Sequence, residues 1–264
     1  MSFSDIVNAV LLNADYLLLL LLRTGGLILG SPIFGRNNIP AMTRIGLVAS
    51  ISLLFFFDAP AVVELSYTNV FGYLIVCAGE LMVGVCLAFV TNMFFSLAFT
   101  GGQLIDMQIG FGIVNVLDPQ LNTQIPMTGN LLNITLLLLF FIMNGHQCLI
   151  EILWLTLEML PVGGLSLSTQ TALAAVEIFA RTFALGVMVA LPVVCSGLVI
   201  EICFGVLMRT VPQLNVFVIG IPLKILIGFF ILIAILPIFI NFSEKIFAEM
   251  FSAIEIIFGT LVTP

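Results

Sequence analysis

The stretch VLMRTVPQLN, residues 206–215, separates two long apolar runs, about Ala172 to Gly205 before it and Val216 to Ile240 after it. Both runs exceed the roughly 20 residues with which an α-helix crosses the hydrocarbon core of a bilayer. A short connection between two long apolar helices makes them antiparallel neighbours. The sequence therefore predicts a helical hairpin within an all-α, membrane-associated fold.

The composition agrees with a membrane environment, because 61% of the 264 residues are hydrophobic and 8% are charged, against about a quarter charged in soluble domains. No basic residue precedes Arg23, so the basic region of a cleavable signal peptide is missing and we expect the first run to stay in the mature protein. Four further apolar runs give a nominal count of six spans, and they cover about 16–30, 45–57, 69–99 and 131–143.

Two other features predict packing. Gly26 and Gly30 have the four-residue spacing that lets a second helix approach closely, although they could also merely fill space. After Pro237, the segment 242–258 places apolar residues on one side and Glu244, Lys245, Glu249 and Glu255 on the other. This pattern predicts an amphipathic helix that lies on a membrane surface or docks on a partner.

The stretch GGQLIDMQIGFGIVNVLDPQLNTQIP, residues 101–126, owes its polarity mostly to amides. Gly110 and Gly112 give backbone freedom on either side of Phe111. Such a segment can form hydrogen bonds in a low-dielectric cavity and detach without stranding a buried charge, as a removable seal must. The alternative is an ordinary surface crossover in which Asp106 and Asp118 cap a turn or a helix.

Three ionisable residues, Glu80, Glu201 and Lys224, lie within apolar runs, where a charge needs a polar partner or a water-filled path. Glu201 lies 14 residues before Asn215 and Lys224 nine after it, so we do not expect the two to face each other across the hairpin. Glu80 has either a structural or assembly role or a role in an ion or proton relay.

Several functions are excluded. The chain has no phosphate-binding G-x-x-x-x-G-K-[ST] loop and no H-E-x-x-H or G-x-S-x-G motif. The single histidine, His146, excludes a multi-histidine metal site, and seven scattered Lys and Arg do not form a nucleic-acid surface. We therefore predict no enzyme activity, no cofactor and no metal. An intramembrane aspartyl enzyme would have only Glu80 and Glu201 as its two carboxylates.

Five blocks of the sequence resemble the FliR family of flagellar export-gate subunits and its injectisome relatives, the SctT or SpaR-like proteins. The blocks are PIFGRNNIPAMTRIGL, GELMVGVCLAF, GGQLIDMQIGFG with DPQ, NGH at 144–146, and RTVPQLNVFVIGIPLK at 209–224. The resemblance covers nearly the whole chain. It implies a gate in the bacterial inner (cytoplasmic) membrane, at the flagellar basal body, where FliR, FliP and FliQ form a pore for unfolded export substrates and FlhB associates from outside.

The resemblance also implies how the chain divides. Residues 1–171 are similar to FliP and contain a plug loop at about 106–124, and residues 172–264 are similar to a FliQ hairpin with an amphipathic C-terminal helix. Residues assigned to the pore plug are Asp106, Gln108, Gly110, Phe111, Gly112, Asn115, Asp118, Pro119, Gln120, Asn122 and Gln124. Residues assigned to assembly or buried polar contacts are Glu80, Glu201, Arg209, Pro212, Gln213, Asn215 and Lys224.

Two alternatives to a flagellar gate subunit remain. One is a secondary transporter or channel for a small solute with Glu80 and Lys224 at its site, although transporters usually have repeated halves and this chain shows none. The other is the injectisome counterpart of the gate. The NGH and PQLNVF blocks favour the flagellar branch.

Overall fold

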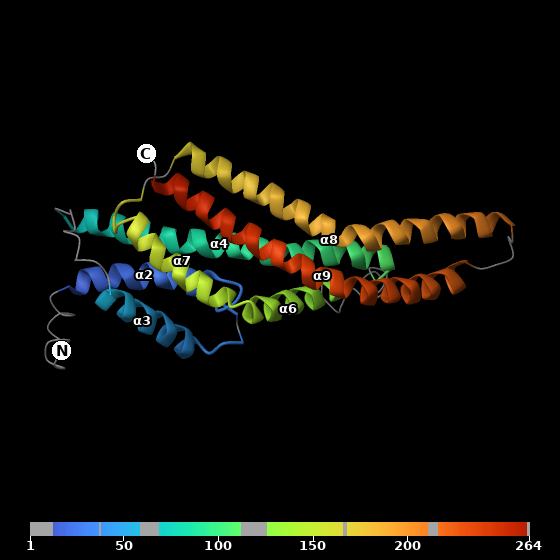
Figure 1. Cartoon of the computed structure of the whole chain (residues 1–264), viewed down its shortest axis with the longest axis horizontal. Coiled ribbons are helices and arrows are strands. Elements are labelled where there is room, and N and C mark those ends of the chain that lie inside the picture. The colour runs from blue at the N-terminus through green and yellow to red at the C-terminus, as the bar shows by residue number, and fades with distance from the viewer. Residues whose placement is uncertain are drawn as a thin grey trace. The chain divides into compact units, whose positions relative to one another are not determined.

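The computed structural model describes residues 13–36, 38–58, 69–111, 126–165, 168–210 and 216–262. These residues form helices and turns and no strand, which confirms the all-α prediction (Figure 1). The helices are α2 (Ala14–Gly30), α3 (Ala41–Asp58), α4 (Val70–Ile109), α6 (Met127–Ile142), α7 (Gly145–Met159), α8 (Thr169–Thr210) and α9 (Val216–Val262).

Four described helices are long and apolar enough to cross a membrane, namely α3, α4, α8 and the part of α9 from Pro222 to Leu261. Helices α6 and α7 together are long and apolar enough for a fifth span, and they are bent by 69° at their junction. Asn144 makes this bend with a left-handed backbone, φ 56°. Within the described residues, length and composition thus give four or five candidate spans where the sequence predicts a nominal six, and α2, with 17 residues, is not among them.

Two helices continue beyond their predicted ends. Helix α4 reaches Ile109 rather than Phe99, and α9 runs through Pro222 and Pro237 to Val262. Proline and glycine are tolerated in helices of this kind when neighbouring helices compensate for the lost contacts. The amphipathic segment is therefore the end of α9, and its apolar face is buried by this chain's own residues: Phe247, Met250, Ile254, Ile257 and Phe258 are at most 4% exposed.

The contacts divide the chain into two compact units. Unit 1 comprises Met1–Asn92, Asn144–Ile178 and Met250–Pro264, and unit 2 comprises Met93–Met143 and Phe179–Glu249. Helices α4, α8 and α9 contribute residues to both units. These units cut across the predicted division at residues 171 and 172, which stays a prediction.

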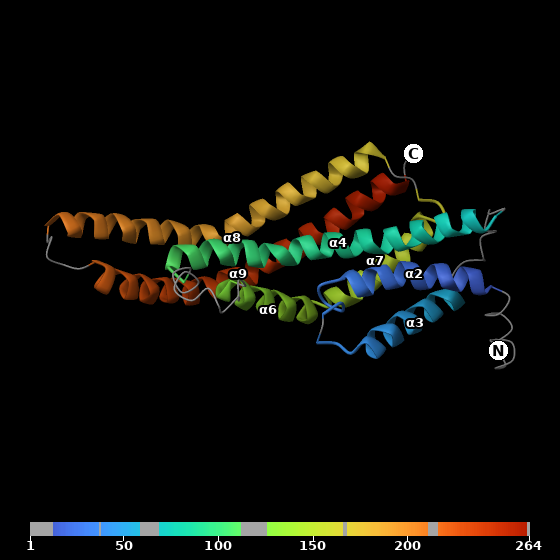
Figure 2. The same ribbon diagram turned by 180° about the vertical axis from the view of Figure 1, so that it is seen from behind.

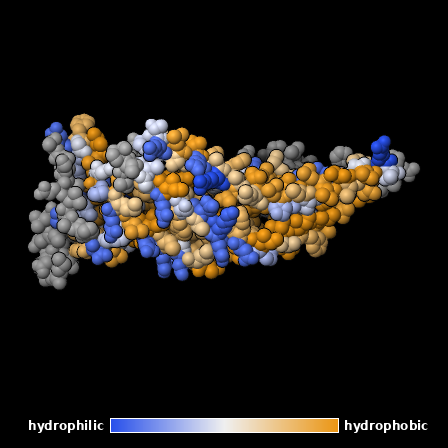
Figure 3. Space-filling view, turned by 45° about the horizontal axis from the view of Figure 1, so that its top comes forward, coloured by the Kyte–Doolittle hydropathy of each residue, from blue (hydrophilic) through white to orange (hydrophobic). Residues whose placement is uncertain are grey.

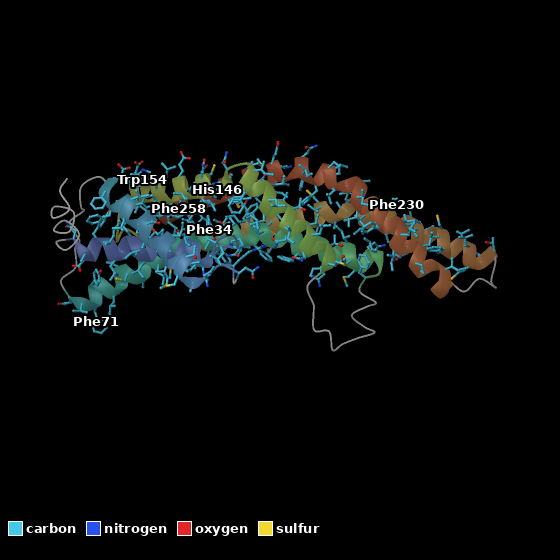
Figure 4. All side chains as sticks on the ribbon, turned by 90° about the horizontal axis from the view of Figure 1, so that it is seen from below. Phe34, Phe71, His146, Trp154, Phe230 and Phe258 are labelled. Atoms are coloured by element: carbon cyan, nitrogen blue, oxygen red, sulfur yellow. The ribbon has the colours of Figure 1, made fainter. Side chains whose placement is uncertain are left out.

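In unit 1, α2 lies beside α3 in both ribbon views (Figures 1 and 2) and packs closely on α4. A Cβ atom on Gly26 would lie 2.8 Å from the carbonyl oxygen of Leu81, and one on Gly30 would lie 2.8 Å from the Cβ of Ala88. The close approach predicted from the glycine spacing is confirmed, with α4 as the partner helix. The ring centroids of Phe55 on α3 and Trp154 on α7 lie 5.1 Å apart, and Figure 4 labels Trp154.

In unit 2, residues 179–210 of α8 and 216–249 of α9 run antiparallel as the predicted hairpin (Figures 1 and 2). Part of its core is an aromatic cluster in which the ring of Phe140 lies 5.6 Å from Phe95 and 5.5 Å from Phe247, between centroids. Figure 3 shows hydrophobic residues gathered over the surface of this hairpin. Ile202 and Phe230 are 68% and 65% exposed there, and Figure 4 labels Phe230 on the α9 arm.

Candidate functional site

Unit 1 surrounds Glu80 with a buried polar cluster, which we call the Arg23–Glu80 cluster. The Nε–H of Arg23 on α2 donates to Oε2 of Glu80 on α4 across 2.6 Å, and both side chains are 1% exposed. Arg23 also donates from its terminal nitrogens to the carbonyl oxygens of Thr156 and Leu160, each across 3.1 Å. The backbone N–H of Gly163 donates to Oε1 of Glu80 across 2.9 Å.

The sequence around this cluster explains its geometry. Helix α7 ends at Met159, and the carbonyl oxygen of Thr156 in its last turn accepts from the backbone N–H of Leu160 across 2.9 Å as well as from Arg23. Arg23 brings a positive charge to this end, where the helix dipole favours a cation. Gly163 then turns the chain with φ 86°, a left-handed conformation that glycine adopts without strain. The ion pair thus joins α2, α4 and the turn that follows α7.

The hydrogen bonding of Glu80 favours a structural role over a relay. Each of its carboxylate oxygens accepts a hydrogen bond from a fixed group, Arg23 or the Gly163 backbone. A charge at this depth is retained when it is paired and hydrogen-bonded, as here. Arg23 was not among the residues selected from the sequence, although its position as the only basic residue of the first apolar run was a signal for it.

Unit 2 holds the two described ends of the amide-rich stretch together through four residues, Gly102, Asp106, Thr128 and Gly129, which we call the loop anchor. The backbone N–H of Thr128 donates to the carboxylate of Asp106 across 3.2 Å, and the Thr128 hydroxyl donates to the same group. A Cβ on Gly102 would lie 2.1 Å from the Cα of Gly129, so α4 and α6 touch through backbone at this point.

The loop anchor changes the predicted start of the plug. Asp106 and Gln108 lie in the last turns of α4 rather than in a loop, and α4 ends at Ile109 followed by Gly110 with φ 100°. Asp106 is 7% exposed and supplies a carboxylate to an N–H of the first turn of α6, which is the capping role weighed as the alternative. The helix is longer than predicted because the glycines at 101 and 102 serve helix contacts and do not break it.

Glu201 and Lys224 form an ion pair across the hairpin, with Nζ of Lys224 2.5 Å from Oε1 of Glu201. The expectation that they do not face each other was wrong, because it counted residues from Asn215. Helix α8 ends at Thr210 and α9 begins at Val216, so Glu201 lies nine residues from its helix end and Lys224 eight from its own. At a rise of about 1.5 Å per residue, these positions lie at nearly the same height.

This pair has a third member in Gln108, whose Nε2 donates to Oε1 of Glu201 across 3.5 Å. The side chains of Glu201 and Lys224 are 48% and 20% exposed within the chain, so neither is fully buried. Arg209, near the end of α8, is exposed as well. Among the predicted polar residues, the structure thus brings together Gln108, Glu201 and Lys224 in unit 2.

The remaining predicted residues lie outside the part of the chain that the structure describes. They are Gly112, Asn115, Asp118, Pro119, Gln120, Asn122 and Gln124 of the plug and Pro212, Gln213 and Asn215 of the hairpin connection. Phe111 is described and follows Gly110, and its backbone N–H donates to the carbonyl oxygen of Asp106 across 3.0 Å. Within the described ranges, no group of three or more His, Cys, Asp or Glu residues could hold a metal ion.

Comparison with known proteins gives a family match over most of the chain. The family model described as bacterial export proteins, family 1, matches residues 15–250. The flagellar biosynthetic protein FliR of Escherichia coli (strain K12) is 31% identical over 243 residues, which cover 91% of this chain and 92% of that protein. FliR of Bacillus subtilis (strain 168) is 29% identical over 247 residues, covering 92% and 94%.

A relative from a different system also matches. The Yop proteins translocation protein T of Yersinia pestis is 27% identical over 196 residues, which cover 73% of this chain and 74% of that protein. Both the Arg23–Glu80 cluster and the loop anchor lie within the residues that the family model matches.

Proposed function

The chain belongs to the FliR family of bacterial export proteins, and we propose that it is a structural subunit of the flagellar type III protein export gate. In this proposal it forms with FliP and FliQ the pore for unfolded flagellar proteins and supplies a plug loop that seals the pore. FlhB associates with the gate, which lies in the bacterial inner membrane at the flagellar basal body. The coarser function, a component of a type III export apparatus, follows from the family itself.

The proposal of a gate built from several chains is supported by the exposed apolar surface of the hairpin. Large apolar side chains on both arms are exposed within this chain, among them Ile202 at 68%, Phe230 at 65% and Ile238 at 62%. Exposed apolar residues gathered on one surface mark a protein or membrane interaction site. A hairpin that lies beside similar hairpins of FliP and FliQ, with lipid covering the rest, would bury this surface.

The plug proposal is supported by the loop anchor. Residues 110–126 connect α4 to α6, and the Asp106–Thr128 hydrogen bonds hold the adjoining ends of the two helices together. A loop whose two ends are held together can fill a pore and withdraw from it while its ends stay in place. Its amide side chains can form hydrogen bonds inside a pore without placing a net charge there.

The comparisons favour the flagellar system over the injectisome. The support lies in coverage, because the two flagellar relatives named above align with 91% and 92% of this chain, whereas the Yop translocation protein aligns with 73% of it. The gene neighbourhood of this chain provides a direct test. Flanking flagellar genes are expected, and flanking injectisome genes would overturn the flagellar assignment.

The gate proposal is tested by co-expression with the genetic neighbours of this chain, followed by purification through a tag on this chain. We expect stable co-purification with two small helical membrane proteins. A chain that always purifies alone as a monomer, and that takes up a radiolabelled small solute in vesicles, would contradict the gate and favour a transporter.

The plug is tested separately by deletion of residues 110–122 in the assembled complex. We expect vesicles that contain the purified complex to become permeable to ions. The deletion leaves the loop anchor in place and removes the residues between Asp106 and Thr128 that would fill the pore. Unchanged conductance in a fully assembled complex would refute the plug while leaving the gate subunit intact.

A further inference from the structure

The last turn of α4 lies in a notch between the two arms of the hairpin in unit 2. A Cβ added to Gly197 on α8 would lie 2.5 Å from Cγ of Gln108, and a Cβ added to Gly228 on α9 would lie 2.7 Å from a γ-carbon of Ile109. Real Cβ atoms do not come so close to other atoms. One glycine on each arm therefore makes the room that two consecutive residues of α4 occupy.

The notch is apolar on one side and polar on the other. Ile109 is 2% exposed and fits against Gly228, where its branched side chain has little rotamer freedom. Gln108 crosses Gly197 and donates to Glu201, which is itself bound to Lys224 of the opposite arm. The contact thus engages both arms at once, by packing and by a hydrogen bond to their ion pair.

From this geometry we propose that the hairpin holds the C-terminal end of α4 in place through Gly197 and Gly228. It thereby retains the position from which the plug loop starts. The inference rests on the proposed plug, because the plug continues from Ile109. If the two arms separate, the notch opens and the Gln108–Glu201–Lys224 contacts are lost together. The loop anchor stays closed in that event, because Asp106 and Thr128 form it without either arm of the hairpin.

The position of the notch is tested by disulfide formation in the assembled complex of the full chain. We expect Ile109→Cys with Gly228→Cys to cross-link on mild oxidation, because a Cβ at residue 228 would lie within bonding reach of the side chain of residue 109. The matched control is Ile109→Cys with Gly205→Cys, since nothing lies within 4 Å of a Cβ at Gly205. A control pair that cross-links as well as the test pair, or a test pair that does not, overturns the proposal.

The effect on retention is tested by Gly197→Ala combined with Gly228→Ala, measured as ion leak of vesicles that contain the complex. A methyl group on Gly197 displaces the Gln108 side chain from Glu201, and one on Gly228 pushes Ile109 out of its close contact. We expect the leak to rise by about tenfold. Gly205→Ala places the same methyl group on α8 in open space and is expected to leave the leak unchanged. If the double variant does not assemble, Gly228→Ala alone is measured, and an unchanged leak overturns the proposed retention.

The outcomes separate this proposal from the plug itself. If the complex leaks after deletion of residues 110–122 but stays tight when both notch glycines carry a methyl group, the plug proposal stands. The proposed retention by Gly197 and Gly228 is then overturned. A complex that stays tight after the deletion has no plug in these residues, and both proposals fall. Leak in both variants, with a tight Gly205→Ala control, supports both.

Discussion

Arg23 and Glu80 are bound through a 2.6 Å contact between Nε and Oε2, and each side chain is 1% exposed. Removing one partner of such a pair leaves the other as an uncompensated buried charge. We expect Glu80→Ala to lower the free energy of unfolding by about 3–5 kcal/mol, measured by denaturation of the purified protein in detergent. The control is Glu158→Ala, because Glu158 is exposed on α7.

Glu80→Gln separates the structural role from a proton relay. Glutamine keeps an oxygen that can accept from Arg23 or from the Gly163 backbone, but it loses the charge and cannot release a proton. If the role is structural, we expect loss of stability and loss of export to change together across the Glu80 variants. Full assembly with wild-type stability but no export would instead assign Glu80 to a relay.

Gly84 is expected to tolerate no side chain. An added Cβ would lie 2.0 Å from the backbone carbonyl oxygen of Arg23, which cannot move without displacing α2. We expect Gly84→Ala to cost on the order of 1–3 kcal/mol, measured as a lower midpoint of thermal unfolding. Gly46→Ala on α3 adds a methyl group where nothing lies within 4 Å, so it should be neutral or stabilising. Equal midpoints for the two variants would contradict the close contact of α2 and α4.

The sequence predicts the elements of this fold better than their ends. Apolar runs reveal most of the helices and the hairpin because burial and membrane insertion both depend on summed hydrophobicity. The ends of α4 and α9 do not follow, since Gly101, Gly102 and Pro237 are helix breakers by local propensity and are overridden by packing with other helices. The sequence showed the amphipathic pattern after Pro237, but it did not show that other residues of the same chain bury its apolar face.

In the candidate site, too, the sequence predicts a residue of interest but not the residues that bind it. Glu80 was predicted because a carboxylate in an apolar run needs a partner, yet its partners Arg23 and the Gly163 backbone come from segments 57 and 83 residues away. No periodicity links such distant positions. The Glu201–Lys224 pair was missed for a smaller reason, since a pairing across a hairpin depends on where each helix ends.

Asp106 and Thr128 should couple energetically, because the carboxylate accepts from both the backbone and the hydroxyl of Thr128. We expect Asp106→Ala to lower the free energy of unfolding by about 0.5–2 kcal/mol, as the loss of a helix cap does. Thr128→Val removes only the hydroxyl donor. A double-mutant cycle should give a coupling of at least about 0.5 kcal/mol, whereas strict additivity would show that the hydroxyl contact contributes nothing. Gln103→Ala, exposed on the same helix, is the control.

Exchange of the two charges at Glu201 and Lys224 should preserve the hairpin contact. Because their side chains are 48% and 20% exposed, we expect each pair-breaking variant, Glu201→Gln or Lys224→Met, to cost less than about 1 kcal/mol in the isolated chain. Glu201→Lys alone places two cations together and should weaken the hairpin further, and adding Lys224→Glu should restore it. The four variants are compared by thermal unfolding at low and high salt, since screening reduces the effect of an exposed pair. A double exchange no more stable than Glu201→Lys alone would show that the two residues do not interact across the arms, and would remove the polar half of the notch that holds Gln108.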